Sequence, residues 1–589
     1  MKRSPVMAKS LPAKRKPILL LTLGTAIAFL AGGALAYGWL TLQNKPILSS
    51  ANVPVGADVI PQTAVVTLSL STDERQWQQL RTFGTSDSQA LFDERLAAWR
   101  DRLLTAHGLD YKRDVAPWIG DTVTLGFLSS AENAETVPSD SATAEEDAES
   151  DVVLVMPIAD PDQAQQVFKD RADQMGEVTE REYKGVTIRE TLGDTPMAIA
   201  VLKNSLLVMA PNGQALEQAI DTQEGGDSLA DTPGYRQSLS MIMVEEQPFL
   251  QAYVNLPATR DAAEASASNL PISGDSFPES RGLAATVTLE SEGVRLQTVT
   301  WLDPDSKTRL TTSNSADKMP GLLPASTLTM LSGSSFKDVW DSYNAQSQIS
   351  ANSPLNPENL RNGVQNALGI NIEQDLIPWM NGEFALALAS GSPDGGTGNL
   401  NVLVLAEAGD RKAAEISMAQ LESALTSRHQ YTVAEEDLNG KATKVLTAPS
   451  GALTVQQGWL DQDVAFWSLS APGATSVLPV TAETSLATAN PLFTTATALA
   501  PTSNVGYFFA DIDRLFNGQN TFPIPALPPS VGSYVEAIRA IAVTARTEND
   551  RTMLYDISVL LKRGSTPGAL PESGSSPLPS EMEPSASPQ

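Results

Sequence analysis

The chain has 589 residues, and 42% of them are hydrophobic, which is enough for several domains of roughly 150 residues each with buried cores. Asp and Glu number 69 against 40 Lys and Arg, so the net charge of −29 argues against a protein that binds nucleic acid through its phosphates. There is no cysteine, which excludes disulfides, thiolate metal sites and Cys nucleophiles, and His107 and His429 are the only histidines.

The first forty residues predict a membrane anchor. Residues 1–17 are basic and contain no acidic side chain, and residues 18–40 form a run of 23 residues without a charge. A helix of about 20 residues crosses the ~30 Å core of a bilayer, so we expect one transmembrane helix with a cytoplasmic N-terminus. The alternative is a signal peptide that is cleaved after Ala36. Both alternatives export the rest of the chain.

Small side chains recur every four residues along the predicted anchor, at Gly24, Ala28, Gly32 and Ala36. Such a stripe lets two helices pack closely, so a homodimer through this face is one interpretation. The other is that small residues are simply common in membrane-spanning helices. Residues 41–56 are expected to form a tether between the anchor and the exported body.

The exported body contains an internal repeat. The segment 108–118 (GLDYKRDVAPW) recurs as 369–379 (GINIEQDLIPW), and both copies are followed by a glycine and an acidic residue. Further matches occur in the same order, namely Pro61 with Pro324, Trp77 with Trp340, Val152 with Val402 and Gly185 with Gly440. We therefore predict a tandem duplication, with a first repeat over 57–303, a linker over 304–318 and a second repeat over 319–562.

Each repeat is predicted to be an α+β domain with mostly antiparallel sheets and with helices on one face. Branched and alternating apolar residues predict strands in the first repeat over 64–70, 122–128, 152–158, 186–190, 197–209 with a turn at Lys203-Asn204, 249–256 and 284–301. A capping box from Ser71 to Glu74 is expected to open the first helix, and further helices are expected over 88–106, 160–175 and 214–221.

Two segments are expected to lack fixed structure. Residues 129–151 contain eight acidic side chains and no basic one, so they predict a mobile loop. Calcium capture is the alternative for this loop, but it lacks the ligand spacing of an EF-hand. The C-terminal segment 563–589 is rich in Pro and Ser and is predicted to be disordered.

No segment predicts a catalytic, cofactor-binding or metal site. Ser334 and Lys337 match the Ser-x-x-Lys pattern of acyl enzymes, but no Lys-Thr-Gly follows and the first repeat has Glu74 in place of the lysine. Trp118 and Trp379 are either ligand platforms or buried core residues, and we favour the core because each Trp follows a proline in a repeated turn-like segment.

Acidic pairs occur at the ends of two predicted strands, Asp160 with Asp162 and Asp511 with Asp513. We expect these side chains to cap helices, because Asp is a favoured residue at a helix N-terminus. His107 and His429 have no neighbouring residues in the sequence that would complete a metal site.

The repeated Asp-x-x-Pro-Trp segments resemble those of a bacterial, mainly cyanobacterial, family known as domain of unknown function 3352. The resemblance rests on Pro61, Trp77, Asp114–Trp118 and their partners Pro324, Trp340 and Asp375–Trp379, and it covers about residues 50–562. It implies a body in the periplasm or the thylakoid lumen, and it brings no catalytic residue, cofactor or metal.

The sequence favours a non-enzymatic binding or assembly module that acts with proteins of the cell envelope or the thylakoid membrane. The reasons are the duplicated scaffold, the predicted anchor and the scarcity of catalytic side chains. The alternative is a carrier or sensor of a small apolar ligand, for which an apolar pocket would be the sign. The least favoured hypothesis is a hydrolase that works without histidine, for which a cleft joining two carboxylates would be the sign.

Overall fold

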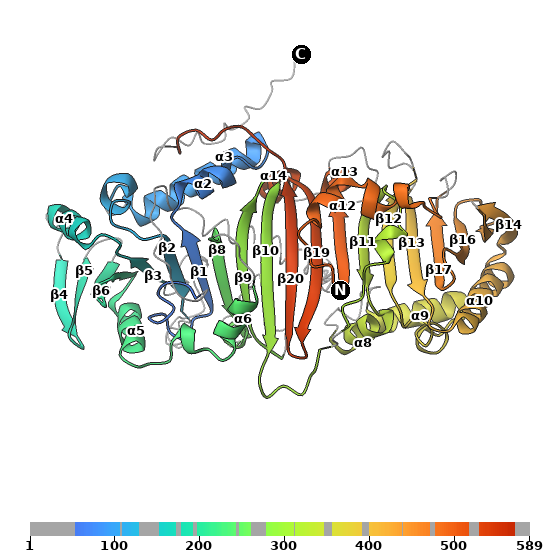
Figure 1. The fold of residues 1–589 in the computed structure, drawn as a ribbon, viewed down its shortest axis with the longest axis horizontal. Helices are drawn as coiled ribbons and strands as arrows, with labels where there is room; N and C mark the ends of the chain where they lie inside the picture. The colour runs from blue at the N-terminus through green and yellow to red at the C-terminus, as the bar shows by residue number, and fades with distance from the viewer. Residues whose placement is uncertain are drawn as a thin grey trace, which may run out of the picture.

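The computed structural model describes residues 53–105, 109–128, 152–171, 178–191, 197–242, 247–260, 279–310, 313–346, 356–391, 400–438, 440–471, 477–516 and 529–571. Twenty strands of this described part form one continuous sheet, with helices along its length (Figure 1). The mixed helix and antiparallel-sheet composition confirms the α+β class. The sheet is single, whereas the sequence predicted separate sheets for the two repeats.

The first half of the sheet consists of β1 (Val66–Ser71), β2 (Thr122–Phe127), β3 (Val152–Pro157), β4 (Val178–Tyr183), β5 (Val186–Thr191), β6 (Met197–Leu202), β7 (Leu206–Ala210), β8 (Leu250–Asn255), β9 (Ser280–Glu290) and β10 (Gly293–Leu302). Its helices are α2 (Glu74–Arg81), α3 (Ser86–Leu103), α4 (Pro161–Arg171), α5 (Gly213–Gln223) and α6 (Tyr235–Met241), with short turns of helix at Tyr111–Val115 and Leu229–Asp231.

The second half consists of β11 (Thr327–Gly333), β12 (Phe384–Ser390), β13 (Leu400–Glu407), β14 (Thr432–Leu438), β15 (Lys441–Thr447), β16 (Thr454–Trp459), β17 (Val464–Ser470), β18 (Gly506–Asp511), β19 (Ile538–Asn549) and β20 (Thr552–Leu561). Its helices are α8 (Phe336–Gln346), α9 (Pro357–Leu368), α10 (Arg411–His429), α11 (Leu486–Ala489), α12 (Pro491–Ala496), α13 (Ile512–Phe516) and α14 (Pro529–Ala537), with short turns at Met319–Gly321, Ile372–Leu376 and Ala482–Thr484.

The strand pairings of the two halves follow the same order. Across the first half the neighbours run β4-β5-β6-β7-β3-β2-β1-β8-β9-β10. Across the second half they run β14-β15-β16-β17-β13-β12-β11-β18-β19-β20. Every strand of one half thus has a counterpart at the same place in the other, and all of these pairs are antiparallel.

The two halves meet at a seam between β10 and β20, which pair along almost their whole length, from Gly293 opposite Leu560 to Trp301 opposite Thr552. In Figure 1 these two strands stand at the centre, with β4 and β14 at the two ends of the sheet. Gln297 and Asp556 lie directly opposite each other. Because each is the fifth residue of its strand, the halves are related by a local twofold relation at this pair.

Both faces of the sheet are covered, which corrects the prediction of helices on one face. In β3, Leu154 and Met156 belong to an apolar cluster with α2 and α3, whereas Val153 and Val155 belong to another cluster with α5 and α6. Successive side chains of a strand point to opposite faces, so the two clusters lie on opposite sides of the sheet. We call the side of Leu154 the α3 face and the other side the α5 face.

Local sequence accounts for the main turns. Lys203 and Asn204 both have positive φ angles, 51° and 57°, as a two-residue hairpin turn requires, so the predicted turn is confirmed. The segment predicted as one bent strand over 284–301 is instead the hairpin of β9 and β10. The predicted cap of the first helix is also displaced, because the side chain of Asp73, not Ser71, accepts the hydrogen bond from a first-turn amide of α2.

The outermost strands carry charged side chains. β4 reads VTEREY and β14 reads TVAEEDL, and most of their residues are exposed. An edge strand has unpaired backbone groups that invite pairing with another chain, and charged side chains oppose such pairing. The charged side chains therefore protect both edges of the sheet against pairing with another chain.

The beginning of the C-terminal segment is folded, contrary to the prediction of disorder from residue 563 onward. The backbone N–H of Gly564 donates to Thr82 at 2.8 Å, and Arg81 donates to the carbonyl of Gly568, also at 2.8 Å. Leu570 packs against the apolar cluster of the α3 face. Residues 563–571 therefore return from the second half of the chain to the first; residues 572–589 lie outside the described residues.

The structure corrects the predicted localisation. Among the described residues no helix has both the length and the apolarity that crossing a membrane requires, so the single-pass membrane protein is not supported. Residues 1–52 lie outside the described residues. The predictions for 1–17, 18–40, the stripe at Gly24, Ala28, Gly32 and Ala36 and most of the tether concern these residues. The predicted loop 129–151 also lies outside the described residues.

Candidate functional site

The two repeated tryptophans are core residues. Trp118 is 3% exposed and Trp379 is 1% exposed, so neither presents a ring to a ligand. The indole N–H of Trp118 donates to the carbonyl oxygen of Asp114 at 2.7 Å, and that of Trp379 donates to the carbonyl oxygen of Asp375 at 3.0 Å. In both halves this bond fixes the ring under a one-turn helix, which is the structural role favoured from the sequence.

The aspartates of the same segments, Asp114 and Asp375, also stabilise the one-turn helix through their carboxylates. One carboxylate oxygen of Asp114 accepts from the backbone N–H of Asp110 at 2.7 Å, and Asp375 accepts in the same way from Asn371 at 2.8 Å. A carboxylate that accepts from a backbone N–H four residues earlier holds that turn closed. The repeated motif is therefore a building element of the fold.

The Ser-x-x-Lys segment forms a helix start and carries no acyl-enzyme geometry. The hydroxyl oxygen of Ser335, next to Ser334, accepts from the N–H of Asp338 at 3.2 Å. Lys337 forms an ion pair with Asp341 one turn along α8, where both side chains are about half exposed. The amine of Lys337 therefore faces a carboxylate at the surface.

The first aspartate of each acidic pair caps a helix, as predicted, whereas the second lies in the first turn of that helix. Asp160 accepts from two backbone N–H groups of α4, each at 3.1 Å. Asp511 accepts from the N–H of Arg514 at 3.0 Å, and Asp513 forms an ion pair with Lys562 at 2.7 Å. His429 lies at the end of α10 with its ring within 2.8 Å of a backbone carbonyl, and His107 lies outside the described residues.

Metal-binding geometry is not found in the part of the chain that the structure describes, which contains no cluster of three or more His, Asp or Glu able to hold an ion. One buried carboxylate is unusual: Glu383 is 8% exposed, and burial raises its pKa above the ordinary value of a glutamate. It accepts from the backbone N–H of Lys318 at 2.9 Å. Glu383 does not line the cavity described below, so its raised pKa reflects burial in the core and does not mark that site.

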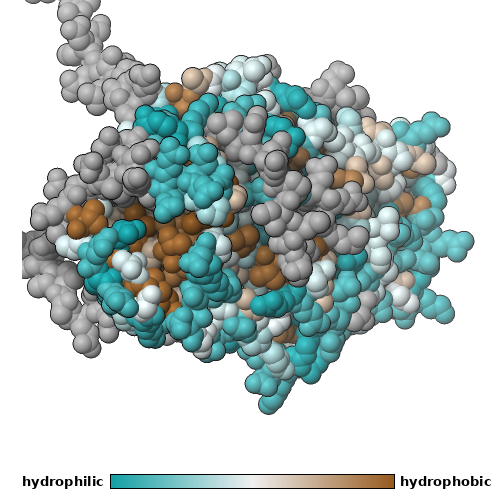
Figure 2. All heavy atoms as spheres, turned by 60° about the vertical axis from the view of Figure 1, so that its left-hand side comes forward, coloured by the Kyte–Doolittle hydropathy of each residue, from teal (hydrophilic) through white to brown (hydrophobic). Residues whose placement is uncertain are grey.

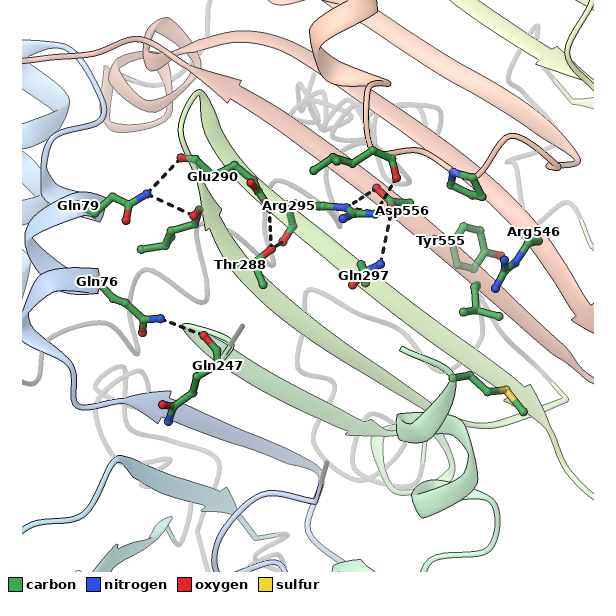
Figure 3. Close-up of a pocket in the computed structure, with 15 residues that line it drawn as sticks. Gln76, Gln79, Gln247, Thr288, Glu290, Arg295, Gln297, Arg546, Tyr555 and Asp556 are labelled. Atoms are coloured by element: carbon green, nitrogen blue, oxygen red, sulfur yellow. Dashed lines mark hydrogen bonds and ion pairs between the residues drawn. The ribbon is translucent and has the colours of Figure 1, made fainter. Parts of the chain in front are cut away.

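A cavity of about 760 Å³ lies at the seam (Figure 3). Its walls come from four neighbouring strands, β9, β10, β20 and β19, and from α2 at one end and the end of α6. The lining residues are polar over much of the surface and include Gln76, Gln79, Gln247, Thr288, Glu290, Arg295, Gln297, Arg546 and Asp556. The cavity is thus shared between the two halves and differs from the apolar pocket that a carrier of an apolar ligand would need.

An ion pair across the seam forms the centre of the cavity. Arg295 of β10 approaches Asp556 of β20 with its Nε atom 3.1 Å from Oδ1 and 3.0 Å from Oδ2, and their side chains are 19% and 10% exposed. Arg295 also donates from Nη2 to the carbonyl of Leu499 at 2.8 Å. A carboxylate held by a guanidinium in this forked way is bound in place, so the geometry suits a binding site better than proton transfer.

A second candidate is an exposed apolar surface on the α3 face of the second half. Leu331 of β11, Leu386 of β12 and Val402 of β13 are 43%, 40% and 47% exposed. Leu331 lies directly opposite Leu386, and Val402 lies opposite Leu388. We call this set of strand residues, Leu331, Leu386, Leu388 and Val402, the apolar strip. Large exposed apolar residues on neighbouring strands mark a contact surface.

The first half has its corresponding strands covered. Leu68 of β1 and Leu125 of β2 occupy the places of Leu331 and Leu386, and they are 7% and 5% exposed. The face that Figure 2 turns forward shows apolar side chains in a hollow between hydrophilic ones, so the first half also has open apolar surface, although Leu68 and Leu125 themselves are buried. The same strands are therefore buried in one half and exposed in the other.

Sequence reasoning missed both candidates. The signal for the cavity was the presence of polar residues inside predicted strands, such as Gln297 and Asp556. Strands at the centre of a sheet rarely contain such residues. The signal for the apolar strip was the presence of apolar residues such as Leu331 and Leu386 in strand-like segments, which a covered strand also contains. Neither signal can be recognised without knowing which strands are neighbours.

Comparison with known proteins adds little on function. No curated protein matches the chain. Crystal form I of TP0453 has 10% sequence identity and a TM-score of 0.24, over 43% of this chain and 81% of that chain. Crystal form III of TP0453 has 9% identity and a TM-score of 0.22, over 44% of this chain and 83% of that chain. The family model described as "Protein of unknown function (DUF3352)" matches residues 22–561, so the chain belongs to this family.

Proposed function

We propose that the chain is a non-enzymatic binding protein that takes part in assembly, and that it holds an amphipathic helix of a partner protein on the apolar strip. The observation that carries the proposal is the exposure of Leu331 and Leu386 at 43% and 40%, beside first-half counterparts that are below 9% exposed. Burying such side chains contributes about 25 cal/mol per Å² of apolar surface, so an open strip favours a partner that covers it.

We infer that the comparison between halves is meaningful because the chain arose by tandem duplication, with repeats over 57–303 and 319–562. The support is that the nine strand pairings of one half recur in the same order in the other. The repeated tryptophan bonds to Asp114 and Asp375 point the same way. A surface that is covered in one copy then indicates what the other copy can receive.

The first half indicates the chemistry of the occupant. Helix α3 places Phe92, Leu96 and Trp99 in one apolar cluster with Leu68 and Leu125. These three side chains are spaced four and three residues apart, so they lie along one face of the helix. A helix with large apolar residues at this spacing is therefore the shape that fits the exposed strip.

The second half lacks an equivalent cover in the described residues. Helix α9 has 12 residues, whereas α3 has 18. Leu360 and Val364 of α9 pack with Trp340, Ile372 and Ile377 in a small cluster that does not include the strip. The helix thus packs against α8 and the one-turn helix, and the strand residues of the strip stay open.

The test uses a synthetic peptide with the sequence of α3, residues 86–103, as the partner helix. We expect saturable binding of the fluorescently labelled peptide to the full chain, with a dissociation constant in the micromolar range. Binding should be lost in a Leu331→Asp/Leu386→Asp variant and kept in Ile416→Asp, which changes an exposed apolar residue of α10 that is 61% exposed. A peptide with Ser in place of Phe92, Leu96 and Trp99 is the second control.

Equal binding by the wild type and the Leu331→Asp/Leu386→Asp variant would refute the proposal, as would an absence of saturable binding. Dodecanoate serves as a competitor. If dodecanoate binds at the strip and the peptide does not, the chain is a carrier of a small apolar ligand instead. Both strand residues are already exposed to solvent, so an aspartate at either place does not have to be buried and the variant should fold.

A further inference from the structure

The cavity at the seam is a site that requires both halves of the chain. β9 and β10 supply one wall, β19 and β20 supply the other, and α2 closes one end with Gln76 and Gln79 (Figure 3). Its volume of about 760 Å³ lies in the range of ~300–1,000 Å³ that is usual for small-molecule sites. It is separate from the apolar strip, which lies on the other face of the sheet.

Four polar side chains form one row across the sheet at the seam, and two of them, Gln297 and Asp556, line the cavity. Thr286 of β9 pairs with Gln297 of β10, Gln297 faces Asp556 of β20, and Asp556 pairs with Thr544 of β19. Residues directly opposite in antiparallel strands point to the same side, so all four lie on the α5 face. Along β10, the next residue on that face is Val299, which is fully buried. The polar row is therefore confined to the region of the cavity.

Several polar atoms of this region have no partner. The hydroxyl groups of Thr286 and Thr544 make no hydrogen bond with the described residues, although each threonine is only 2% exposed. The side-chain oxygen of Gln76, which lines the cavity, is likewise buried and without a partner among the described residues. A buried polar group that stays unpaired costs about 1–3 kcal/mol. Of these three residues only Gln76 lines the cavity, so its unpaired oxygen is the one that indicates a ligand.

The charged groups, in contrast, are already matched. Arg295 and Asp556 hold each other in a forked ion pair, and Arg546 pairs with Glu548 at 2.9 Å. Glu290 accepts from the hydroxyl group of Thr288 at 3.4 Å. Both arginines of the lining are thus already paired, so the lining offers no spare cation for a phosphate. A ligand with a strong net charge would have to break an existing pair.

The remaining polar groups of the lining are amides and hydroxyls. Two of the amino groups are already used, because Gln76 donates to the backbone carbonyl of Gln247 at 3.0 Å and Gln297 donates to Asp556 at 3.5 Å. Gln76, Gln247 and Gln297 each carry a carbonyl oxygen that accepts and an amino group that donates, and a threonine hydroxyl does both with one atom. Apolar contact is offered beside them by Leu289, Leu499, Pro501 and Leu554. A ligand with many hydroxyl groups and exposed C–H faces satisfies both kinds of surface at once.

We propose that the cavity at the seam binds a neutral, polyhydroxylated ligand of the size of a short oligosaccharide. Gln76 and Gln297, which line the cavity, bond its hydroxyl groups, and the Arg295–Asp556 pair holds the floor rigid. The proposal does not depend on the helix-binding function, because it concerns the opposite face of the sheet. A variant of the apolar strip should therefore leave it unchanged.

The experiment is titration calorimetry of the full chain with maltotriose, cellotriose and chitotriose as neutral probes. Inorganic phosphate and spermidine serve as charged probes, and dodecanoate serves as an apolar probe. We expect saturable binding of at least one trisaccharide and none of the charged probes. Gln297→Leu should weaken that binding at least about tenfold, which corresponds to ~1.4 kcal/mol.

Thr298→Val is the matched control. Thr298 follows Gln297 in β10, is 8% exposed and points to the opposite face, so its replacement should change trisaccharide affinity less than about twofold. The double variant Thr286→Val/Thr544→Val supplies a second measurement. We expect its melting temperature to rise, because two unpaired hydroxyls are removed, while its affinity for the trisaccharide changes less than about twofold, because neither threonine lines the cavity.

Three results would overturn the proposal. The first is that no neutral trisaccharide binds at millimolar concentration, and the second is that a charged or apolar probe binds more tightly than every trisaccharide. The third is a Gln297→Leu variant that binds every trisaccharide as the wild type does, because Gln297 lines the cavity. The melting curve of each sample shows whether the variant is folded, so a loss of binding can be distinguished from a loss of folding.

Discussion

The ion pair between Arg295 and Asp556 provides a quantitative test of how the two halves are held together. It joins β10 to β20, and its side chains are 19% and 10% exposed. Removing one partner of a buried pair costs ~3–5 kcal/mol because the other charge is left uncompensated. Some solvent reaches this pair, so we expect Asp556→Leu and Arg295→Met each to lower the free energy of unfolding by about 2–3 kcal/mol.

The double variant Arg295→Met/Asp556→Leu should be much less affected than the two single changes together. Apolar residues of similar size can replace a buried pair at little cost, so we expect the double variant within about 1 kcal/mol of the wild type. The coupling free energy of the cycle should then be at least ~2 kcal/mol. Urea unfolding followed by tryptophan fluorescence measures all four proteins.

The control cycle uses Arg189 and Glu180, which pair across β4 and β5 with both side chains 60% exposed. An exposed pair of this kind is worth about 0.2–1 kcal/mol, so the coupling should be small. The reasoning fails if the Arg295–Asp556 coupling is no larger than that of the surface pair. It also fails if the double variant loses as much stability as the sum of the single variants.

Trp379→Phe should cost about 1 kcal/mol in urea unfolding, because the bonds of the indole N–H to the Asp375 carbonyl and the Ser417 hydroxyl oxygen, each at 3.0 Å, are lost. The cost is moderate because the Ser417 hydroxyl still donates to that carbonyl, and a loss below ~0.5 kcal/mol would contradict this role. Gly293→Ala should lower the free energy of unfolding by about 3 kcal/mol, because a Cβ there would lie 2.0 Å from a carbonyl oxygen of β20. The control Gly363→Ala lies in open space on α9 and should be neutral or stabilising by up to ~1 kcal/mol. Similar melting temperatures for the two variants would refute the seam geometry. Burial raises the pKa of Glu383 in the folded state, so the folded chain prefers the protonated form and loses stability as pH rises through that pKa. Glu383→Gln should therefore melt above the wild type at pH 8, with a difference that shrinks toward pH 4, and a difference independent of pH would count against this cause.

Local elements could be read from the sequence because each depends on neighbouring residues. The Lys203-Asn204 turn is an example, since both residues need a positive φ and Asn tolerates it. The burial of Trp118 was predictable from its place beside a repeated proline. Helix boundaries were less certain: Asp73 rather than Ser71 caps α2, because either side chain can accept from a first-turn amide and tertiary packing decides between them.

Long-range pairing could not be read in this way. β10 and β20 are separated by the whole second half, and an apolar alternating strand does not specify which edge it joins. The sequence therefore predicted two sheets where one exists. The same lack of information hid the cavity, because Gln297 and Asp556 become neighbours only when the seam is formed. The folded start of the C-terminal segment was missed because Leu570 is one apolar residue in a Pro- and Ser-rich stretch.

The seam has a consequence for biosynthesis. β20 begins at Thr552, about 250 residues after the end of β10 at Leu302. At a synthesis rate of ~5–20 residues per second, a ribosome needs roughly 12–50 s to deliver the partner strand. During that interval the newly made first half carries a ten-residue strand with unsatisfied backbone groups, and two nascent chains on one messenger could join through it. Holding this strand apart until the last part of the chain emerges is a task suited to a chaperone.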